Sequence, residues 1–335
     1  MTKNDNVVLV DFIMDSSSDF IRTLNNCDIW GWKSIGVPSN GAINKRNRHK
    51  KWIKFTFQIF KQRSEFHHIL SWQQFLGIYL SAFCRLLHVK KTFHIHIMTF
   101  IYKSRQGWKG KLYHHFINYA ISAKYVDSII IFGGEHELAY YQQCFSSCKD
   151  KFIALPLGIS KIKDIGTVSE SNFILAAGRS NRDYQFLVNA IKGTPYRLII
   201  ISDTLLKEYE SDNIKILNDV YLPKMFDYLN AAKCVVIPLS DPNISSGQLF
   251  FLQSMQLGKP IIITESNALS GYIENGVNGL IIPKTKEALL GALDSVLSDS
   301  TLYEHLQANG KRMYEEQFSE VGMAKNIINK VINRL

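Results

Sequence analysis

Residues 243–283 read NISSGQLFFLQSMQLGKPIIITESNALSGYIENGVNGLIIP, and this stretch decides the fold. Small polar residues and Gly247 come first, and apolar residues then recur at helical spacing. Gly258-Lys259-Pro260 ends this predicted helix, and residues 261–264 follow as a short, fully apolar strand. A glycine-containing turn that opens a helix presents free N–H groups at the positive end of the helix dipole, so it favours an anion. The polar loop at 265–270 is expected to face the same anion.

The same stretch resembles the donor-binding region of GT-B glycosyltransferases, in particular the retaining, nucleotide-sugar-dependent enzymes of family 4. Their pattern is approximately E-G-F-G-x-x-x-x-E-A-M-x-x-G-x-P-V-I, followed by a glycine-rich turn and G-x-x-G-L-L-V. Two glutamates of that pattern are replaced here by Ser245 and Gln253, which can hydrogen-bond to hydroxyl groups but carry no charge. In the family, the first glutamate contacts the transferred sugar and the second contacts the ribose. The matching positions are Met255, Gly258, Lys259, Pro260, Gly276, Asn278, Gly279 and Leu280.

The resemblance also implies a diphosphate site at Gly178-Arg179, which is similar to the G-R of the family. The second cation of the family is usually a lysine slightly farther along, and Arg182 is the nearest candidate here. Arginine binds phosphate bidentately and can offset charge on a leaving group. Alternatively, Arg182 and Asp183 pair or cap locally. The other donor-binding candidates are Ser245, Ser246, Gly247, Gln248, Leu249 and Gln253.

Short apolar runs alternate with helical stretches along the whole chain of 335 residues. This alternation predicts right-handed βαβ units and parallel sheets. We expect an α/β protein with the GT-B fold, in which two Rossmann-like domains face each other across a cleft. The predicted parts are an acceptor-binding domain at 1–160, a nucleotide-sugar-binding domain at 161–318, and a C-terminal helix at 319–335 that packs back towards the first domain. Predicted strands include 7–13, 67–71, 93–98, 128–132, 173–177, 197–201, 214–217 and 234–238.

Ligands of parallel sheets lie beyond the carboxyl ends of the strands. This rule places Ser71, Thr99 and Arg105 on the acceptor-side rim of the first domain. His136, in Gly133-Gly134-Glu135-His136-Glu137, is a candidate acid or base, with an ordinary histidine at a helix start as the alternative. No D-x-D motif is present and the five cysteines form no second pair, so we expect free thiols and no metal cofactor.

The net positive charge of the chain lies entirely in its first half. Residues 1–150 contain 20 Lys and Arg against 10 Asp and Glu, whereas residues 151–335 contain 19 of each. The densest basic segment, at 45–63, carries Trp52, Phe55, Ile59 and Phe60 at helical steps. Such a helix suits an anionic membrane surface, or its apolar stripe packs on its own domain. The apolar run at 75–89 contains Arg85 and is too short to span a bilayer, so a core helix is expected, with shallow membrane insertion as the alternative.

Together these features predict a glycosyltransferase that moves a sugar from a nucleotide-sugar, with a UDP-sugar favoured, to a lipid-linked or glycan acceptor. The resemblance implies retention of configuration and a role in bacterial surface polysaccharides such as capsule or lipopolysaccharide. The alternatives are a nucleotide-sugar epimerase and an inactive binding protein. No signal peptide is expected, so the predicted location is the cytoplasmic face of the cell membrane. Nucleic acid is not an expected partner, because no motif of that kind is present.

Overall fold

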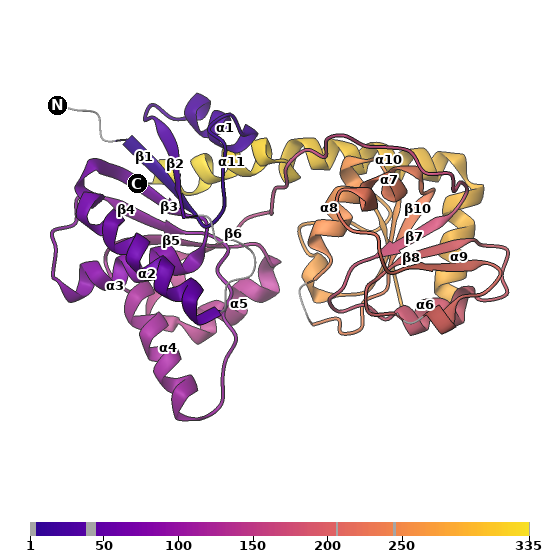
Figure 1. Cartoon of the computed structure of the whole chain (residues 1–335), viewed down its shortest axis with the longest axis horizontal. Coiled ribbons are helices and arrows are strands. Elements are labelled where there is room, and N and C mark those ends of the chain that lie inside the picture. The colour runs from indigo at the N-terminus through magenta and orange to yellow at the C-terminus, as the bar shows by residue number, and fades with distance from the viewer. Residues whose placement is uncertain (1–4, 38–44, 206, 244–245, 335) are drawn as a thin grey trace. The chain divides into compact units, whose positions relative to one another are not determined.

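The computed structural model describes residues 5–37, 45–205, 207–243 and 246–334, and it divides into two compact units (Figure 1). Unit 1 consists of Met1–Leu155 and Met323–Leu335, and unit 2 of Pro156–Gly322. The first boundary lies before residue 160 because the backbone that follows Leu155 is bonded to unit 2. The Leu157 N–H donates to the Tyr272 hydroxyl (2.9 Å), and the Ile159 N–H donates to the Phe318 carbonyl (2.9 Å).

Unit 1 is built on a six-stranded parallel sheet of order β2-β1-β3-β4-β5-β6. Its edge strand β2 and the helix α1 were not predicted, because the sequence WKSIG of β2 has no apolar run and the strand is half exposed. The strands are β1 (Asp5–Val10), β2 (Trp32–Gly36), β3 (Phe66–Ser71), β4 (His94–Ile97), β5 (Val126–Ile131) and β6 (Phe152–Ala154). The helices are α1 (Asp19–Cys27), α2 (Lys45–Gln62), α3 (Gln74–Leu86), α4 (Gly107–Ile121), α5 (Gly134–Cys144) and α11 (Glu320–Lys330), of which the part from Met323 belongs to this unit.

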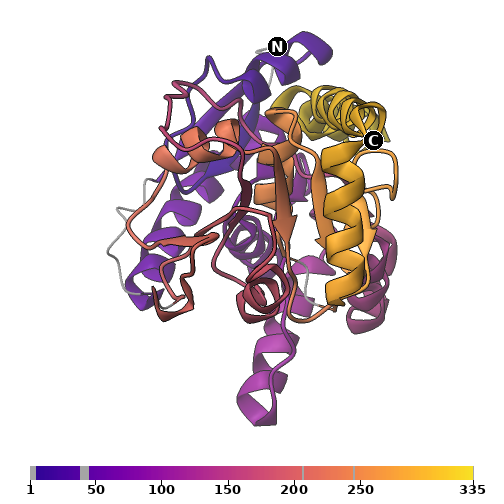
Figure 2. The same ribbon diagram turned by 90° about the vertical axis from the view of Figure 1, so that its right-hand side faces the viewer.

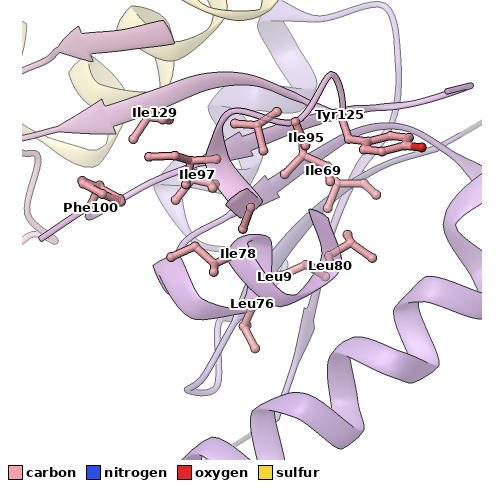
Figure 3. Packing of buried hydrophobic residues seen from close by; sticks show 14 of the residues in the cluster. Leu9, Ile69, Leu76, Ile78, Leu80, Ile95, Ile97, Phe100, Tyr125 and Ile129 are labelled. Carbon is pink, nitrogen blue, oxygen red and sulfur yellow. The ribbon is translucent and has the colours of Figure 1, made fainter. Parts of the chain in front are cut away.

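The main core of unit 1 lies between the sheet and the helices α2 and α3. Side chains from α3 point at isoleucines of β3, β4 and β5, as Figure 3 shows. Burial of such apolar side chains from water is the largest favourable term in folding. The residues labelled in that view are Leu9, Ile69, Leu76, Ile78, Leu80, Ile95, Ile97, Phe100, Tyr125 and Ile129.

The basic helix α2 uses its apolar stripe for this core. Trp52 is 3 % exposed and stacks on Phe75 of α3, with ring centroids 5.8 Å apart, and Phe55, Ile59 and Phe60 are also buried. Of the two readings of residues 45–63, the one in which the stripe packs on its own domain is therefore confirmed. The membrane reading of this stripe is wrong, because its apolar side chains are already covered. The run at 75–89 likewise forms the core helix α3.

The opposite face of the unit 1 sheet carries a row of histidines. His68 of β3 and His96 of β4 are both buried, and their Nδ1 and Nε2 atoms lie 3.0 Å apart. The other ring nitrogen of His96 lies 2.8 Å from the Ser128 hydroxyl of β5. Burial, followed by repulsion from His67 and His94, lowers the pKa of His68 to about 4. Burial and repulsion from His68 lower the pKa of His96 to about 3. The two rings are therefore neutral near pH 7.

Unit 2 repeats the architecture with a parallel sheet of order β12-β11-β10-β7-β8-β9. Strands β9 and β11 have the bounds predicted from the sequence, and β11 is the continuous apolar run expected of a buried parallel strand. The strands are β7 (Ile174–Ala177), β8 (Leu198–Ile201), β9 (Ile214–Leu217), β10 (Cys234–Ile237), β11 (Ile261–Thr264) and β12 (Leu280–Ile282). The helices are α6 (Tyr184–Ile191), α7 (Lys224–Ala231), α8 (Gln248–Gln256), α9 (Lys286–Ser298) and α10 (Ser300–Met313).

Candidate functional site

The candidate site of unit 2 lies at the carboxyl ends of β7 and β10. The loop after β7 begins at Gly178, whose φ of +122° favours glycine. The Tyr184 hydroxyl donates to the Gly178 carbonyl (2.6 Å), and the side chain of Asp183 caps α6 by accepting from the Phe186 N–H (3.0 Å). Both ends of the loop are thus fixed, and the residues between them, Arg179 and Arg182, have defined directions.

Arg182 points inward from this loop. Its guanidinium donates to the carbonyls of Ala177 (3.3 Å) and Ser180 (2.9 Å), and burial lowers its pKa. Within the described residues, it forms no ion pair with a carboxylate. A half-buried guanidinium with carbonyl partners but no counter-ion is suited to an anionic ligand. The alternative in which Arg182 and Asp183 cap or pair locally is confirmed for Asp183, which caps α6, although the ion pair of Asp183 is with Lys284 (3.2 Å) and not with Arg182.

Arg179 points outward, and its side chain is 70 % exposed. It forms a bidentate ion pair with Asp203, with one contact of 3.1 Å between Nε and Oδ1. Arg179 is thus occupied by a carboxylate, whereas Arg182 is bonded only to backbone carbonyls within the described residues.

The start of α8 lies next to Arg182. Gly247 is the N-cap residue with φ +93°, and a Cβ built on it would lie 3.6 Å from Arg182 Nη2. As a glycine, Gly247 supplies no side-chain cap to this helix start. The neighbouring Ser246 hydroxyl oxygen is buried and has no hydrogen-bond partner among the residues that the structure describes. A guanidinium, a helix start with a glycine N-cap and a hydroxyl without a partner among the described residues therefore lie together, and such groups suit an anion.

The remaining donor-side candidates are all close to this helix start in the sequence. Gln248 and Gln253 are half-buried residues of α8, and Leu249 is exposed on its first turn. Ser245, which stands in place of the first family glutamate, lies outside the described residues.

Asn181 joins the arginine loop to the loop after β10, and sequence analysis missed this role. Its side-chain amide donates to the Asp241 carbonyl (2.9 Å) and accepts from the Asp241 N–H (2.8 Å). Two backbone bonds join the same loops, from Asp183 to Pro238 (2.8 Å) and from Ser240 to Asn181 (3.3 Å). Asn181 adopts φ +54°, a region in which asparagine is enriched. A positive φ cannot be recognised from the spacing of residues. The only signal in the sequence was the residue type of Asn181, because asparagine adopts such a φ more often than most residues.

The polar loop at 265–270 is held against the segment before α8. The Asn267 N–H and the Ser266 hydroxyl both donate to the Pro242 carbonyl, at 2.9 and 2.8 Å. The Asn267 side chain donates to Asn243 Oδ1 (2.8 Å). Three loops of unit 2 are therefore joined at one edge of its sheet.

The predicted rim of unit 1 is only partly available to a ligand. Ser71 is fully buried, and its hydroxyl donates to the Gln73 carbonyl (2.7 Å) and accepts from the Gly77 N–H (2.7 Å). Its assignment to the acceptor rim is wrong, because both bonds serve the start of α3. Thr99 has φ +47°, a strained conformation for a β-branched residue and one of the kind that clusters at functional sites.

Arg105 and His136 are both exposed at the same edge of unit 1. Arg105 lies over the Tyr113 ring, 4.4 Å from its centroid, and His136 lies on the first turn of α5. In the described part of the chain, no group of three or more His, Cys, Asp and Glu side chains is placed to hold a metal ion. No helix in the described ranges is both long and apolar enough to span a bilayer.

Part of this chain matches a known protein family. Residues 171–299 match the family model described as "Glycosyl transferases group 1". This segment is similar to group 1 glycosyltransferase domains. The matched residues contain β7 and the arginine loop, the start of α8 and the loop at 265–270, so they include every part of the candidate site of unit 2.

A curated relative is also named as a glycosyltransferase. An "uncharacterized glycosyltransferase" of Methanocaldococcus jannaschii is 23 % identical over 164 residues, which cover 48 % of this chain and 36 % of the relative. The match therefore spans only about a third of the relative.

Solved structures resemble the whole chain. Sucrose-phosphate synthase from Thermosynechococcus elongatus superposes with a TM-score of 0.67 at 15 % identity, over 98 % of both chains. Anabaena HepE, solved in complex with UDP, gives 0.67 at 11 % identity over 98 % of this chain and 100 % of its own. WaaG, described as a glycosyltransferase involved in lipopolysaccharide biosynthesis, gives 0.59 at 13 % identity over 97 % and 99 %. The fold is GT-B, as predicted.

Proposed function

We propose that the protein transfers a sugar from a nucleotide-sugar, with a UDP-sugar favoured, to a lipid-linked or glycan acceptor in the synthesis of a bacterial surface polysaccharide. Unit 2 binds the donor and unit 1 binds the acceptor. The observation that carries the proposal is the half-buried Arg182 beside the glycine N-cap of α8, within the segment that matches glycosyltransferases. The UDP bound to HepE supports the choice of nucleotide, since HepE shares this fold.

The chemistry that these residues serve is cleavage of the bond between the anomeric carbon and the diphosphate. As that bond breaks, its electron pair moves to the diphosphate oxygen, where Arg182 and the N–H groups of α8 offset the growing negative charge. The acceptor hydroxyl attacks the same face of the sugar, and its proton passes to the departing phosphate oxygen. This route retains the configuration and uses no protein nucleophile. It also needs no metal ion, because the guanidinium and the helix start supply the positive charge.

The donor site is tested with free nucleotides and two arginine variants. A nucleotide at 100 times its Kd stabilises the protein by about 2.7 kcal/mol, so UDP should raise the melting temperature of wild type by several degrees. Arg182→Ala should lose about 2–5 kcal/mol of UDP affinity, because the diphosphate loses a charge-assisted partner. Arg179→Ala should lose less, since this side chain is occupied by Asp203. Arg312→Ala is the control, because Arg312 forms an exposed pair with Glu316 far along the chain. UDP affinity that is unchanged in Arg182→Ala would remove the diphosphate site from the proposal.

The acceptor separates the transferase from its two alternatives. UDP- and GDP-sugars are incubated with and without a lipid-linked oligosaccharide. Release of nucleotide that depends on the acceptor identifies a transferase, a changed sugar without release identifies an epimerase, and neither product identifies a binding protein. Gln253→Glu, which restores the family carboxylate, tests the ribose contact separately.

We also propose that the protein acts at the cytoplasmic face of the cell membrane, where lipid-linked acceptors are available. The positive charge of the first half of the chain supports this location, because anionic headgroups attract Lys and Arg. The apolar stripe of α2 does not take part, since it is buried in unit 1. Co-sedimentation with anionic and neutral vesicles is the test, and equal binding to both would count against the location.

A further inference from the structure

Helix α4 and the segment before it extend away from the rest of unit 1. Figures 1 and 2 show this helix, in magenta, projecting from the unit in two perpendicular views. The projecting part, residues 101–112, is named the α4 tip here. It follows β4, so it lies at the same edge of the sheet as Thr99. An element of this kind presents a convex surface, whereas a small-molecule site is concave.

The exposed face of α4 is apolar and aromatic. Trp108 is 71 % exposed, Leu112 is 62 % exposed and Tyr119 is 38 % exposed. Their spacing of four and seven residues places the three side chains on one side of the helix. Ile101, in the segment before the helix, is exposed as well. An exposed tryptophan and leucine on a projecting helix indicate a surface that meets an apolar or amphipathic partner.

Basic residues surround this apolar stripe, and no acidic residue interrupts it. Lys103, Arg105, Lys109 and Lys111 are all exposed within the α4 tip. From residue 66 to residue 126 the sequence contains eight Lys and Arg and no Asp or Glu. The charge of this surface is therefore complementary to an anionic partner over its whole length.

The α4 tip is an ordered part of the fold. Tyr102 is buried; its ring stacks on Tyr113 at 5.9 Å, and its hydroxyl oxygen lies 3.0 Å from His114 Nδ1. A Cβ on Gly110 would lie 2.0 Å from the Arg105 carbonyl oxygen, so only glycine allows the loop to lie against the helix here. The exposed Trp108 is consequently held in place by a folded base.

We propose that the α4 tip docks on an anionic phospholipid bilayer, with Trp108 and Leu112 at the depth of the headgroups and the lysines against the lipid phosphates. This inference rests on the proposed function, since docking brings the rim at Thr99 to the surface that holds a lipid-linked acceptor. Tryptophan and basic residues around an apolar helix face are typical of interfacial helices. A nucleic-acid duplex would contact mainly the basic side chains through its phosphates, and the exposed apolar stripe would then have no partner.

The charge is tested with two variants of equal net charge. Lys109→Glu with Lys111→Glu changes the α4 tip, and Lys51→Glu with Lys54→Glu makes the same change on the exposed side of α2. Partitioning onto vesicles of phosphatidylglycerol and phosphatidylcholine is measured by co-sedimentation. Each lysine near the surface contributes roughly a factor of five, so the tip variant should bind at least about 25-fold more weakly than wild type. The α2 variant should bind the vesicles about tenfold more tightly than the tip variant. Equal losses in the two variants would overturn the proposal.

The apolar stripe and the alternative partner are tested in the same assay. Trp108→Ser with Leu112→Ser leaves every charge in place, and its vesicle binding should fall at least about tenfold because the buried apolar area is lost. Wild-type tryptophan emission should shift to the blue on vesicles, and the shift should be smaller in Trp108→Phe. Unchanged vesicle binding in the serine variant, or wild-type binding to a DNA duplex but not to vesicles, would refute lipid docking. The thermal shift that UDP causes is measured for each variant. A variant that binds UDP but not vesicles leaves the proposed function intact. If UDP does not shift the melting temperature of wild type, the proposed function is contradicted, and the lipid-docking proposal is not affected.

Discussion

Acidification should destabilise unit 1 through the buried pair of His68 and His96. Their rings have a pKa of about 4 and about 3 in the folded protein, against 6.5 in an ordinary histidine. Asp28 and Asp127 oppose this effect on His68, but burial is the larger cause. The unfolded chain therefore binds more protons than the folded chain below pH 6.5. The contribution of these two neutral rings to the free energy of unfolding is at its full value above pH 6.5. It is lost as the pH falls from 6.5 towards 4.

The size of the loss follows from the same pKa values. At pH 5 an unfolded histidine is almost fully protonated, whereas a group of pKa 4 is only about one-tenth protonated. The difference corresponds to roughly 2 kcal/mol for His68 and a similar amount for His96. A loss of about 4 kcal/mol is a large part of the 5–15 kcal/mol that is typical of a folded domain.

Tryptophan fluorescence reports the unfolding of unit 1 separately from that of unit 2. All five tryptophans of the chain belong to unit 1: Trp30, Trp32, Trp52, Trp72 and Trp108. Guanidinium unfolding followed by fluorescence at pH 7.5 and pH 5.0 should show the loss as a lower midpoint at pH 5.0.

His68→Asn removes one of the two titrating groups, so the difference between the two pH values should fall by about half. The control is His305→Asn, which changes an exposed histidine of α10 in unit 2. A wild-type midpoint that is the same at both pH values, or a difference that His68→Asn leaves unchanged, would show that these histidines do not control acid stability.

The other predictions concern the donor loop and the helix α2. Gly178→Ala adds a Cβ 2.9 Å from Arg182 Nη2 at φ +122°, so UDP affinity measured by calorimetry should fall more than thermal stability; equal UDP affinity would contradict this. Asn181→Ala removes both side-chain bonds to Asp241 and should weaken UDP binding by about 1–2 kcal/mol, and a wild-type Kd would show that the loop holds its shape without them. Trp52→Ala should destabilise unit 1 by about 3–5 kcal/mol in guanidinium unfolding. Trp52→Phe should be much milder, because the indole N–H has no hydrogen-bond partner among the described residues, and similar losses in the two variants would contradict this reasoning.

The strands of unit 2 show what a sequence can predict without a structure. Strand β11 has its predicted bounds, since a parallel strand buried on both faces is a continuous apolar run. Strand β9 also has its predicted bounds, although it is an edge strand that contains the exposed Lys215. Strand β2 was missed because only Trp32 of its residues is buried, so its sequence contains no apolar run. The GT-B fold was predicted from motif positions that match in combination, and the superpositions confirm it.

The candidate site was predicted only as far as its segments. Spacing placed Arg179 and Arg182 on one loop, but the side chain that faces the start of α8 depends on the bonds between Asn181 and Asp241, which are 60 residues apart. In the same way, the carboxyl-end rule located Ser71 correctly in the sheet, yet its hydroxyl is used by the backbone of α3.

The sequence by itself determined the periodic elements and their order, because helices and strands are set by contacts between residues a few positions apart. It also determined that the helix α2 carries an apolar stripe. Only the tertiary structure decided what each face contacts. The stripe with Trp52 is covered by α3, whereas the stripe with Trp108 remains exposed, although both lie on basic helices. The physical reason is that a periodic pattern records the need for burial, while the partner that provides it is brought close by the folding of distant segments.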